Sequence, residues 1–134
     1  MSGFLDANLV VRYVVRDPPE LAALAAGVID SEEGLLITEG VIAETAHVLT
    51  RLYGIPRSDV VDDLIDLVQK ENISTFDLDK GVVVQGLLMC RPSGRVSFAD
   101  AMLWAAARSS GNRVVYSLDR RFPQDGVEVR PGNI

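Results

Sequence analysis

Short apolar runs alternate with segments of helical periodicity along this chain, and this alternation restricts its fold more than any other feature. Each run has the length of a short strand, and apolar side chains in the intervening segments recur every three to four residues. The runs lie at residues 4–5, 35–37, 73–76, 114–116 and 127–129. Strands that alternate with helices imply right-handed crossovers and parallel pairing. The sequence therefore predicts the α/β class, as a parallel sheet of about five strands covered by helices on both faces.

Helical segments separate these runs, and most of them start at a recognisable cap. Five begin near a polar residue of the kind that commonly caps a helix, namely Asp17, Thr38, Ser58, Asp77 and Ser97. The last segment, from Ser97 to about Ala107, is apolar on nearly all sides, so we expect it to be central and buried. Gly111 is expected to end this segment.

The size and composition of the chain suit one independently folding domain, residues 1–134. Cys90 is the single cysteine, so an internal disulfide is excluded and a reduced compartment is expected. Arg12 and Arg16 interrupt the first apolar run, and no run reaches the roughly 18 to 20 residues of a membrane span. The N-terminus also lacks the features of a secretory signal. We therefore expect a cytoplasmic protein that does not associate with membranes.

Four acidic residues fall where this pattern would bring carboxylates to one edge of the sheet. Asp6, Asp100 and Asp119 lie at a strand end or a helix start, and Glu44 lies in the helix after the second strand. Such junctions share one rim of an open parallel sheet, which is where ligands bind. Mg²⁺ prefers hard oxygen ligands and keeps several waters, so a few carboxylates suffice without His or Cys. The pattern therefore predicts a divalent metal site.

Taken singly, three of these acids also have a structural explanation. Asp6 and Asp119 are suited to capping a helix, as is Asp77. Asp100 stands three residues after Ser97, close to a capping-box arrangement, although Glu or Gln is the usual partner there. Both explanations stay open at this point, because a helix cap and a metal ligand occupy the same kind of position.

Glu44 differs from the other acids because it lies inside a helix. It falls between Val41 and Val48, so part of its side chain is expected to border apolar surface. An ionised carboxylate in such surroundings needs a compensating cation. A metal ion would supply that charge, and so would His47 or Arg51 on the same helix.

Four short motifs resemble those of PIN-domain nucleases, particularly the VapC-type toxins, in their order and spacing. They are Phe4-Leu5-Asp6-Ala7-Asn8, Val41-Ile42-Ala43-Glu44, Asp100-Ala101 in a long apolar helix, and Ser117-Leu118-Asp119-x-x-Phe122. The resemblance covers essentially the whole chain. It implies a PIN-like fold in which Asp6, Glu44, Asp100 and Asp119 are catalytic and bind Mg²⁺ or Mn²⁺ for hydrolysis of RNA phosphodiester bonds. Asn8 and Ser117 match supporting polar positions, with Ser117 where the family usually has Thr.

The resemblance also implies a strand order and a set of partners. The first strand would be central, between the second and the fourth, which would place Asp6, Asp100 and Asp119 near one crevice and leave Asp77 on an outer strand. The partners would be an RNA substrate, a cognate antitoxin protein whose tail covers the active-site groove, and a second copy of the chain in a homodimer.

Several arginines flank the predicted acidic site. The net charge of −6 argues against nucleic-acid binding through a broad basic face, but it leaves room for a small metal-neutralised site. Arg95 precedes Asp100, and the pair Arg120-Arg121 follows Asp119. We expect some of these arginines to hold RNA phosphates or an antitoxin carboxylate. The alternative is a solvated loop whose arginines contact nothing in particular.

Other functions fit the residues less well. A phospho-accepting receiver domain would need an acidic pair near Asp6 and a lysine late in the chain, but no lysine follows Lys80. A haloacid-dehalogenase-like phosphatase would need Asp-x-Asp, whereas the chain has Asp6-Ala7-Asn8. An RNA-processing PIN nuclease and a catalytically silent PIN-like binding domain stay open as alternatives to the toxin.

Overall fold

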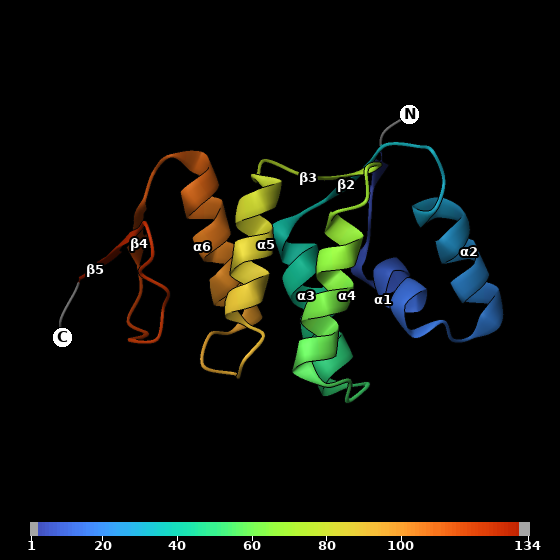
Figure 1. The fold of residues 1–134 in the computed structure, drawn as a ribbon, viewed down its shortest axis with the longest axis horizontal. Coiled ribbons are helices and arrows are strands. Elements are labelled where there is room, and N and C mark those ends of the chain that lie inside the picture. The colour runs from blue at the N-terminus through green and yellow to red at the C-terminus, as the bar shows by residue number, and fades with distance from the viewer. Residues whose placement is uncertain (1–2, 132–134) are drawn as a thin grey trace.

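The computed structural model describes residues 3–131, in which helices and short parallel strands alternate (Figure 1). The helices of this part of the chain are α1 (Ala7–Val15), α2 (Pro19–Ile29), α3 (Glu39–Arg51), α4 (Arg57–Val68), α5 (Lys80–Met89) and α6 (Phe98–Ser110). The strands are β1 (Gly3–Phe4), β2 (Leu35–Ile37), β3 (Ile73–Thr75), β4 (Val114–Tyr116) and β5 (Glu128–Arg130). All their pairings are parallel, so the predicted α/β class is confirmed.

Within residues 3–131 the strands form two parallel sheets instead of one. The larger sheet has the order β1-β2-β3, with Gly3 opposite Leu35 and Leu35 opposite Ile73. The smaller sheet pairs β4 with β5, with Val114 opposite Glu128. The central strand is therefore β2, and the expectation that the first strand lies between the second and the fourth is wrong for these residues.

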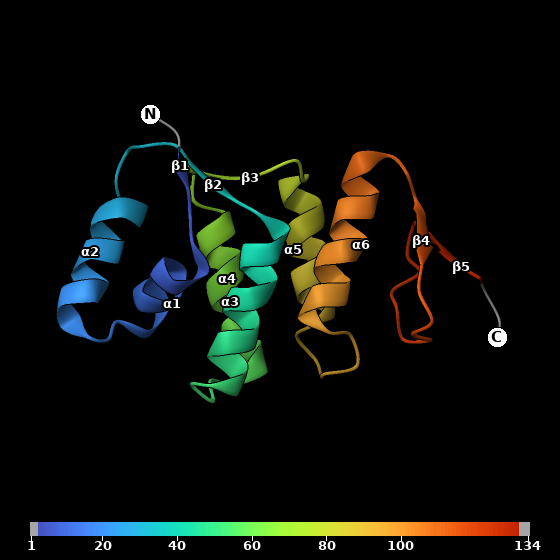
Figure 2. The ribbon, with the colours of Figure 1, turned by 180° about the vertical axis from the view of Figure 1, so that it is seen from behind.

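Helix packing explains the division into two sheets. Helix α6 packs against α3 and α5, and the chain that leaves α6 continues to the outer side of that helix. Figures 1 and 2 show β4 and β5 at one end of the long axis, with α5 and α6 between them and the larger sheet. Strand β4 therefore does not pair with β1. Instead, β1 pairs in parallel with β2, and β4 pairs in parallel with β5.

Two predicted helix caps are confirmed by their hydrogen bonds. Thr38 Oγ1 accepts the Val41 N–H at 3.2 Å at the start of α3. Ser97 Oγ accepts the Asp100 N–H at 3.0 Å at the start of α6. Each bond satisfies one of the backbone donors that the first turn of a helix leaves without an intrahelical partner.

Three other predicted caps are wrong by one or two residues. Pro18 and Pro56, rather than Asp17 and Ser58, occupy the N-cap positions of α2 and α4. Proline is well suited to the start of a helix, because its φ is fixed near the helical value and it has no N–H that would lack an intrahelical acceptor. At α5 the cap is Asp79, whose Oδ1 accepts the Val82 N–H at 3.1 Å. The φ of Asp77 is 56°, and this left-handed backbone belongs to a turn before the helix.

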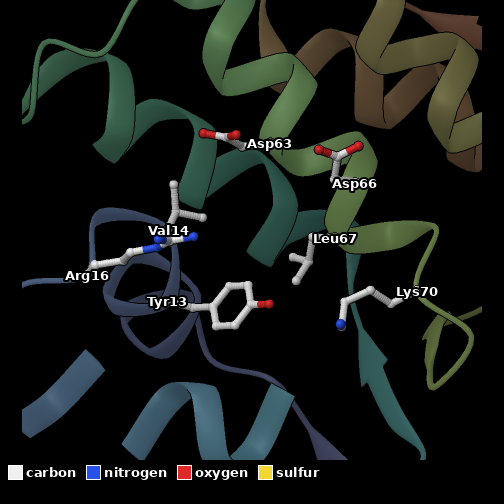
Figure 3. A pocket seen from close by; sticks show the side chains of 7 residues that line it. All are labelled: Tyr13, Val14, Arg16, Asp63, Asp66, Leu67 and Lys70. Carbon is white, nitrogen blue, oxygen red and sulfur yellow. The ribbon is translucent and has the colours of Figure 1, made fainter. Parts of the chain in front are cut away.

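Polar contacts join the first two helices to the end of α4. Tyr13 Oη donates to Asp30 Oδ1 at 2.6 Å, and Lys70 Nζ forms an ion pair with the same oxygen at 3.1 Å. These bonds engage Asp30, the residue that follows the last residue of α2, Ile29. Beside them lies a hollow of about 270 Å³ between α1 and α4 (Figure 3).

The expectation that the last helix is central and buried is confirmed. The side chains of Met102 and Trp104 in α6 are almost fully buried, and Trp104 is 1% exposed. Leu103 faces outward and is 47% exposed, because the outer side of α6 is covered only in part. The indole Nε1–H of Trp104 donates to the carbonyl oxygen of Asp125 at 2.9 Å. This bond attaches the segment between β4 and β5 to α6.

No helix in residues 3–131 is long and apolar enough to cross a membrane. The longest, α3 and α6, have 13 residues each, whereas a span needs about 20. Cys90 is buried directly after α5, and burial raises the pKa of its thiol to about 11. The thiol is therefore protonated at neutral pH, so Cys90 behaves as a small apolar residue of the core.

A glycine sets the distance between α5 and α6. A Cβ at Gly86 would lie 3.1 Å from the carbonyl oxygen of Ala101 and 3.3 Å from the Cε of Met102. The carbonyl oxygen belongs to the backbone of α6 and cannot move aside without moving the helix. Only glycine therefore permits this close packing.

We expect Gly86→Val to lower the free energy of unfolding by about 1–3 kcal/mol, the usual cost of overpacking a core. Gly27→Val is the matched control, because Gly27 is exposed on α2 and an added Cβ would meet nothing within 4 Å. That variant should stay within about 0.5 kcal/mol of the wild type. Urea denaturation followed by circular dichroism measures both values. Equal stability of the two variants would show that the α5–α6 contact tolerates a larger side chain.

Candidate active site

Two of the predicted acids, Asp100 and Asp119, are in direct contact. Asp100 lies in the first turn of α6, and Asp119 lies three residues after the end of β4. Their carboxyl groups lie close enough for each to shift the pKa of the other. Both residues are half-buried, so the pair is shielded from water on one side and open on the other. A helix start and a strand end thus deliver two carboxyl groups to one place.

The surroundings of the two carboxyl groups push their pKa values in opposite directions. Burial raises the pKa of Asp100, and the neighbouring charge of Asp119 raises it further. The backbone N–H of Arg121, which donates to Asp119 Oδ1 at 2.8 Å, lowers the pKa of Asp119. The guanidinium of Arg121 adds to this effect, with Nε 3.3 Å from the same oxygen. Asp119 is therefore the stronger acid of the pair, and Asp100 takes up a proton first as the pH falls.

Hydroxyl groups hold the backbone on both sides of the pair. Ser97 Oγ accepts the N–H of Asp100, as described for the start of α6. Ser117 Oγ accepts the N–H of Asp119 at 3.1 Å and so fixes the turn after β4. The predicted supporting residue Ser117 thus contacts the acid that it precedes by two positions.

Arg57 positions the start of α6 from a distant part of the chain. Its Nη2–H donates to the carbonyl oxygen of Val96 at 2.6 Å, and its Nε–H donates to that of Cys90. The guanidinium also stacks on the ring of Phe98, 4.3 Å from the centroid. The sequence gives no signal for this role, because carbonyl acceptors 33 and 39 residues away leave no residue-type signature.

Asp6, Asn8 and Glu44 do not join the pair in the structure. Asp6 precedes α1, where its side chain makes no capping bond to the described residues, and all three side chains are exposed. Glu44 is exposed to solvent, so it needs no buried cation. Between residues 3 and 131, no three Asp, Glu, His or Cys side chains lie close enough to hold one metal ion. The separation of β1 from β4 explains this, because it keeps Asp6 away from Asp119.

The Asp100–Asp119 pair fits a hard divalent cation. Mg²⁺ is often held by only one or two carboxylates, with waters and substrate phosphates completing its coordination. Two adjacent carboxyl groups disfavour joint ionisation, and a cation relieves that repulsion. The donor set is oxygen only, so it suits Mg²⁺ or Mn²⁺ better than a metal that prefers thiolate or imidazole.

The three predicted arginines line one hollow beside the pair. Arg95, Arg120 and Arg121 surround a space of about 490 Å³, together with Phe122 and Asp125. The lining residues include three arginines and one acid, Asp125, and the guanidinium of Arg121 also contacts Asp119, so a cationic excess remains that favours an anion. Arg91 of the same loop is engaged elsewhere, because it forms two hydrogen bonds to Asp62 at 2.9 and 3.0 Å.

A family model described as PIN domain matches residues 3–126. This span contains both carboxyl groups of the pair, the three arginines of the hollow, and the more distant Asp6 and Glu44. No curated protein matches the chain at a significant level.

Neutralising the two acids should change stability in opposite directions. The raised pKa of Asp100 means that its ionisation destabilises the folded state at pH 7, so Asp100→Asn should keep or raise the melting temperature of metal-free protein. That advantage should vanish below the ordinary pKa of an aspartate, about 3.9. The pKa of Asp119 is lowered, so its stabilising effect is present at pH 7, and Asp119→Asn should lower the melting temperature.

If the pair belongs to a Mg²⁺-dependent site that cleaves RNA, both variants should reduce cleavage by more than about tenfold, since replacing even a residue that only supports a metal ligand lowers activity 10- to 100-fold. Differential scanning calorimetry and an RNA cleavage assay provide the two measurements. If Asp100→Asn were less stable but fully active, Asp100 would be a helix cap and not a part of the active site.

Proposed function

This chain belongs to the PIN-domain family, and on that premise we propose that it is a Mg²⁺- or Mn²⁺-dependent endoribonuclease. PIN domains are generally nucleases that use a divalent metal. The observation that supports the proposal most is the proximity of Asp100 and Asp119, whose carboxyl groups have pKa values shifted in opposite directions. Such a pair is suited to receive a cation, because the cation relieves the repulsion between two ionised carboxylates.

Different residues would hold the metal ion and position its ligands at this site. Asp119 offers an ionised carboxylate that Arg121 and Ser117 hold in place, and Asp100 offers a second ligand at the capped start of α6. When bound, Mg²⁺ would acidify an attacking water and stabilise the leaving oxygen of the phosphodiester. Arg57 supports the site indirectly, since it fixes the loop that precedes Asp100.

The substrate backbone would be held by the hollow that Arg95, Arg120 and Arg121 line. Guanidinium groups match the geometry of phosphate oxygens and are suited to bidentate contacts. With a net charge of −6, the rest of the surface offers little attraction for RNA, so binding would depend on this local cationic region. The same hollow could accept a carboxylate from the tail of an antitoxin, in competition with RNA.

Within the family we favour the toxin of a toxin–antitoxin pair, because the four motifs are similar to those of VapC-type toxins. An RNA-processing nuclease has the same chemistry. A catalytically silent binding domain is the second candidate, and one observation favours it: residues 3–131 bring only two carboxyl groups of the predicted set together. Growth arrest on induction, with mapping of the cleaved RNA ends, separates the toxin from the other two.

Purified protein should cleave RNA with Mg²⁺ or Mn²⁺ and should stop when EDTA is added in excess, because phosphodiester hydrolysis depends on the metal. Addition of Mg²⁺ beyond the chelator should restore cleavage. The Asp119→Asn variant is the control for a contaminating nuclease. Undiminished cleavage in excess EDTA by the wild type, but not by this variant, would rule out the metal mechanism.

Replacing Arg95 and Arg120 with Ala should weaken RNA binding and reduce its dependence on salt. Each lost phosphate contact should lower the slope of log K against log salt by about 0.7 for a single strand. Arg113→Ala is the matched control, because Arg113 is an exposed arginine near the opposite end of α6, about 20 Å from the site. Filter binding of Mg²⁺-free protein across a salt series measures the slopes. Identical slopes for all variants would remove the hollow from the binding site.

A further inference from the structure

An uncharged groove of about 390 Å³ lies between α6 and β4. Leu103, Ala106 and Ala107 line its side on α6, and residues of the segment 112–116 line the opposite side. None of the described residues that line the groove carries a charge. Leu103 is 47% exposed, so the apolar surface of the groove is accessible from outside. The volume of the groove lies in the range of about 300–1,000 Å³ that is usual for small-molecule sites.

The groove ends at the acid pair. Figures 1 and 2 show α6 and β4 side by side and running in opposite directions, and the two elements are in contact. Asp100 precedes Leu103 by three residues on α6, so the two residues lie on the same face of the helix, about one turn apart. Asp119 follows the end of β4 by three residues. The start of α6 and the end of β4 therefore place the acid pair at one end of the groove.

The hollow that is lined by Arg95, Arg120 and Arg121 lies on the other side of the acid pair. Arg95 comes before Asp100 on one wall, and the two other arginines come after Asp119 on the opposite wall. Each wall therefore leads in the same order from the uncharged groove to an acid and then to arginine. A nucleotide has the same division, because its uncharged base lies beside a charged phosphate.

The backbone of β4 supplies hydrogen-bonding groups beside the groove. On the β5 side, the Ser117 N–H donates to the carbonyl oxygen of Arg130 at 2.9 Å, and the Glu128 N–H donates to that of Arg113 at 2.7 Å. In this parallel register the N–H and C=O of Tyr116 point away from β5. Within residues 3–131 these two groups have no backbone partner. Tyr116 also lines the groove, so one donor and one acceptor are available there.

We propose that this groove binds the base of the nucleotide next to the cleaved phosphodiester bond. The inference rests on the proposed function, since it adds a base subsite to the same active site. The flat face of the base packs on Leu103 and Ala107, and its edge bonds to the backbone N–H and C=O of Tyr116. Proteins recognise unstacked RNA bases by contacts of this kind, with side chains against the ring and hydrogen bonds at its edge. The continuity of the groove with the acid pair favours this occupant, and its lack of charge favours a base over a phosphate.

Binding of RNA with and without bases tests the subsite independently of cleavage. Metal-free wild type should bind a mixed-sequence oligoribonucleotide about tenfold more tightly than an abasic ribose-phosphate oligomer of the same length, because packing of one base contributes about this much. Ala106→Phe fills the groove and should remove this difference, while the salt dependence of binding to the abasic oligomer stays unchanged. Ala23→Phe is the matched control, because Ala23 is exposed on α2, outside the groove.

A second variant and a folding control complete the binding test. Leu103→Gln makes the groove polar at a half-exposed position and should weaken binding to the base-bearing RNA in the same way. Circular dichroism should show that the variants fold. Equal affinities of the wild type for the two oligomers would overturn the inference. Unchanged RNA binding by the folded groove variants would overturn it too, and would leave the groove to another occupant, such as an added peptide strand.

Cleavage of RNA with a single abasic residue tests the position of the subsite. When abasic residues are introduced one at a time around a mapped cut, cleavage with Mg²⁺ should slow about tenfold only where the missing base adjoins the cut on one side. Equal effects at all positions would overturn the inference and leave the ribonuclease proposal intact. A wild type that cleaves no RNA would instead refute the ribonuclease proposal, on which the subsite depends.

Discussion

The arrangement of the carboxyl pair depends on the guanidinium of Arg57. It donates to carbonyl oxygens on both sides of the loop between α5 and α6, and it stacks on the ring of Phe98 at the start of α6. A buried carbonyl group that loses its partner costs about 1–3 kcal/mol, so these bonds restrict the loop strongly. The first turn of α6, and with it Asp100, is thereby held from the start of α4. The close packing of α5 on α6 at Gly86 also restricts the position of α6.

Local signals in the sequence were sufficient for the elements but not for their assembly. The runs at 35–37 and 114–116 are strands with the predicted bounds, and Thr38 and Ser97 cap helices as predicted. These features are predictable because strand length and cap chemistry depend on a few adjacent residues. Asp77 was predicted as a cap in place of Asp79, because the sequence does not reveal that Asp77 adopts a left-handed backbone, with a φ of 56°. Strand order depends on where α6 packs, and no local pattern encodes that contact.

The same distinction applies to the site. Asp100 lies at the start of a helix and Asp119 follows a strand, and the sequence predicts both of these boundaries well. Their opposite pKa shifts could not be predicted, since they arise from burial and from a backbone N–H of Arg121. The grouping of Asp6 and Glu44 with this pair was expected from the alternation of strands and helices and from the resemblance in motifs. Both carry information about the order of residues, but neither shows which strand edges meet in this chain.

The bond between Trp104 and Asp125 has a practical consequence. Trp104 is the single tryptophan of the chain, and its indole N–H is bonded to the segment that connects β4 to β5. Its emission is therefore sensitive to one structural event, the attachment of the smaller sheet to α6. Release of that sheet would expose the indole to water and shift the emission to longer wavelength while the rest of the core stayed folded. The chain thus carries an intrinsic optical reporter at the junction between its two sheets.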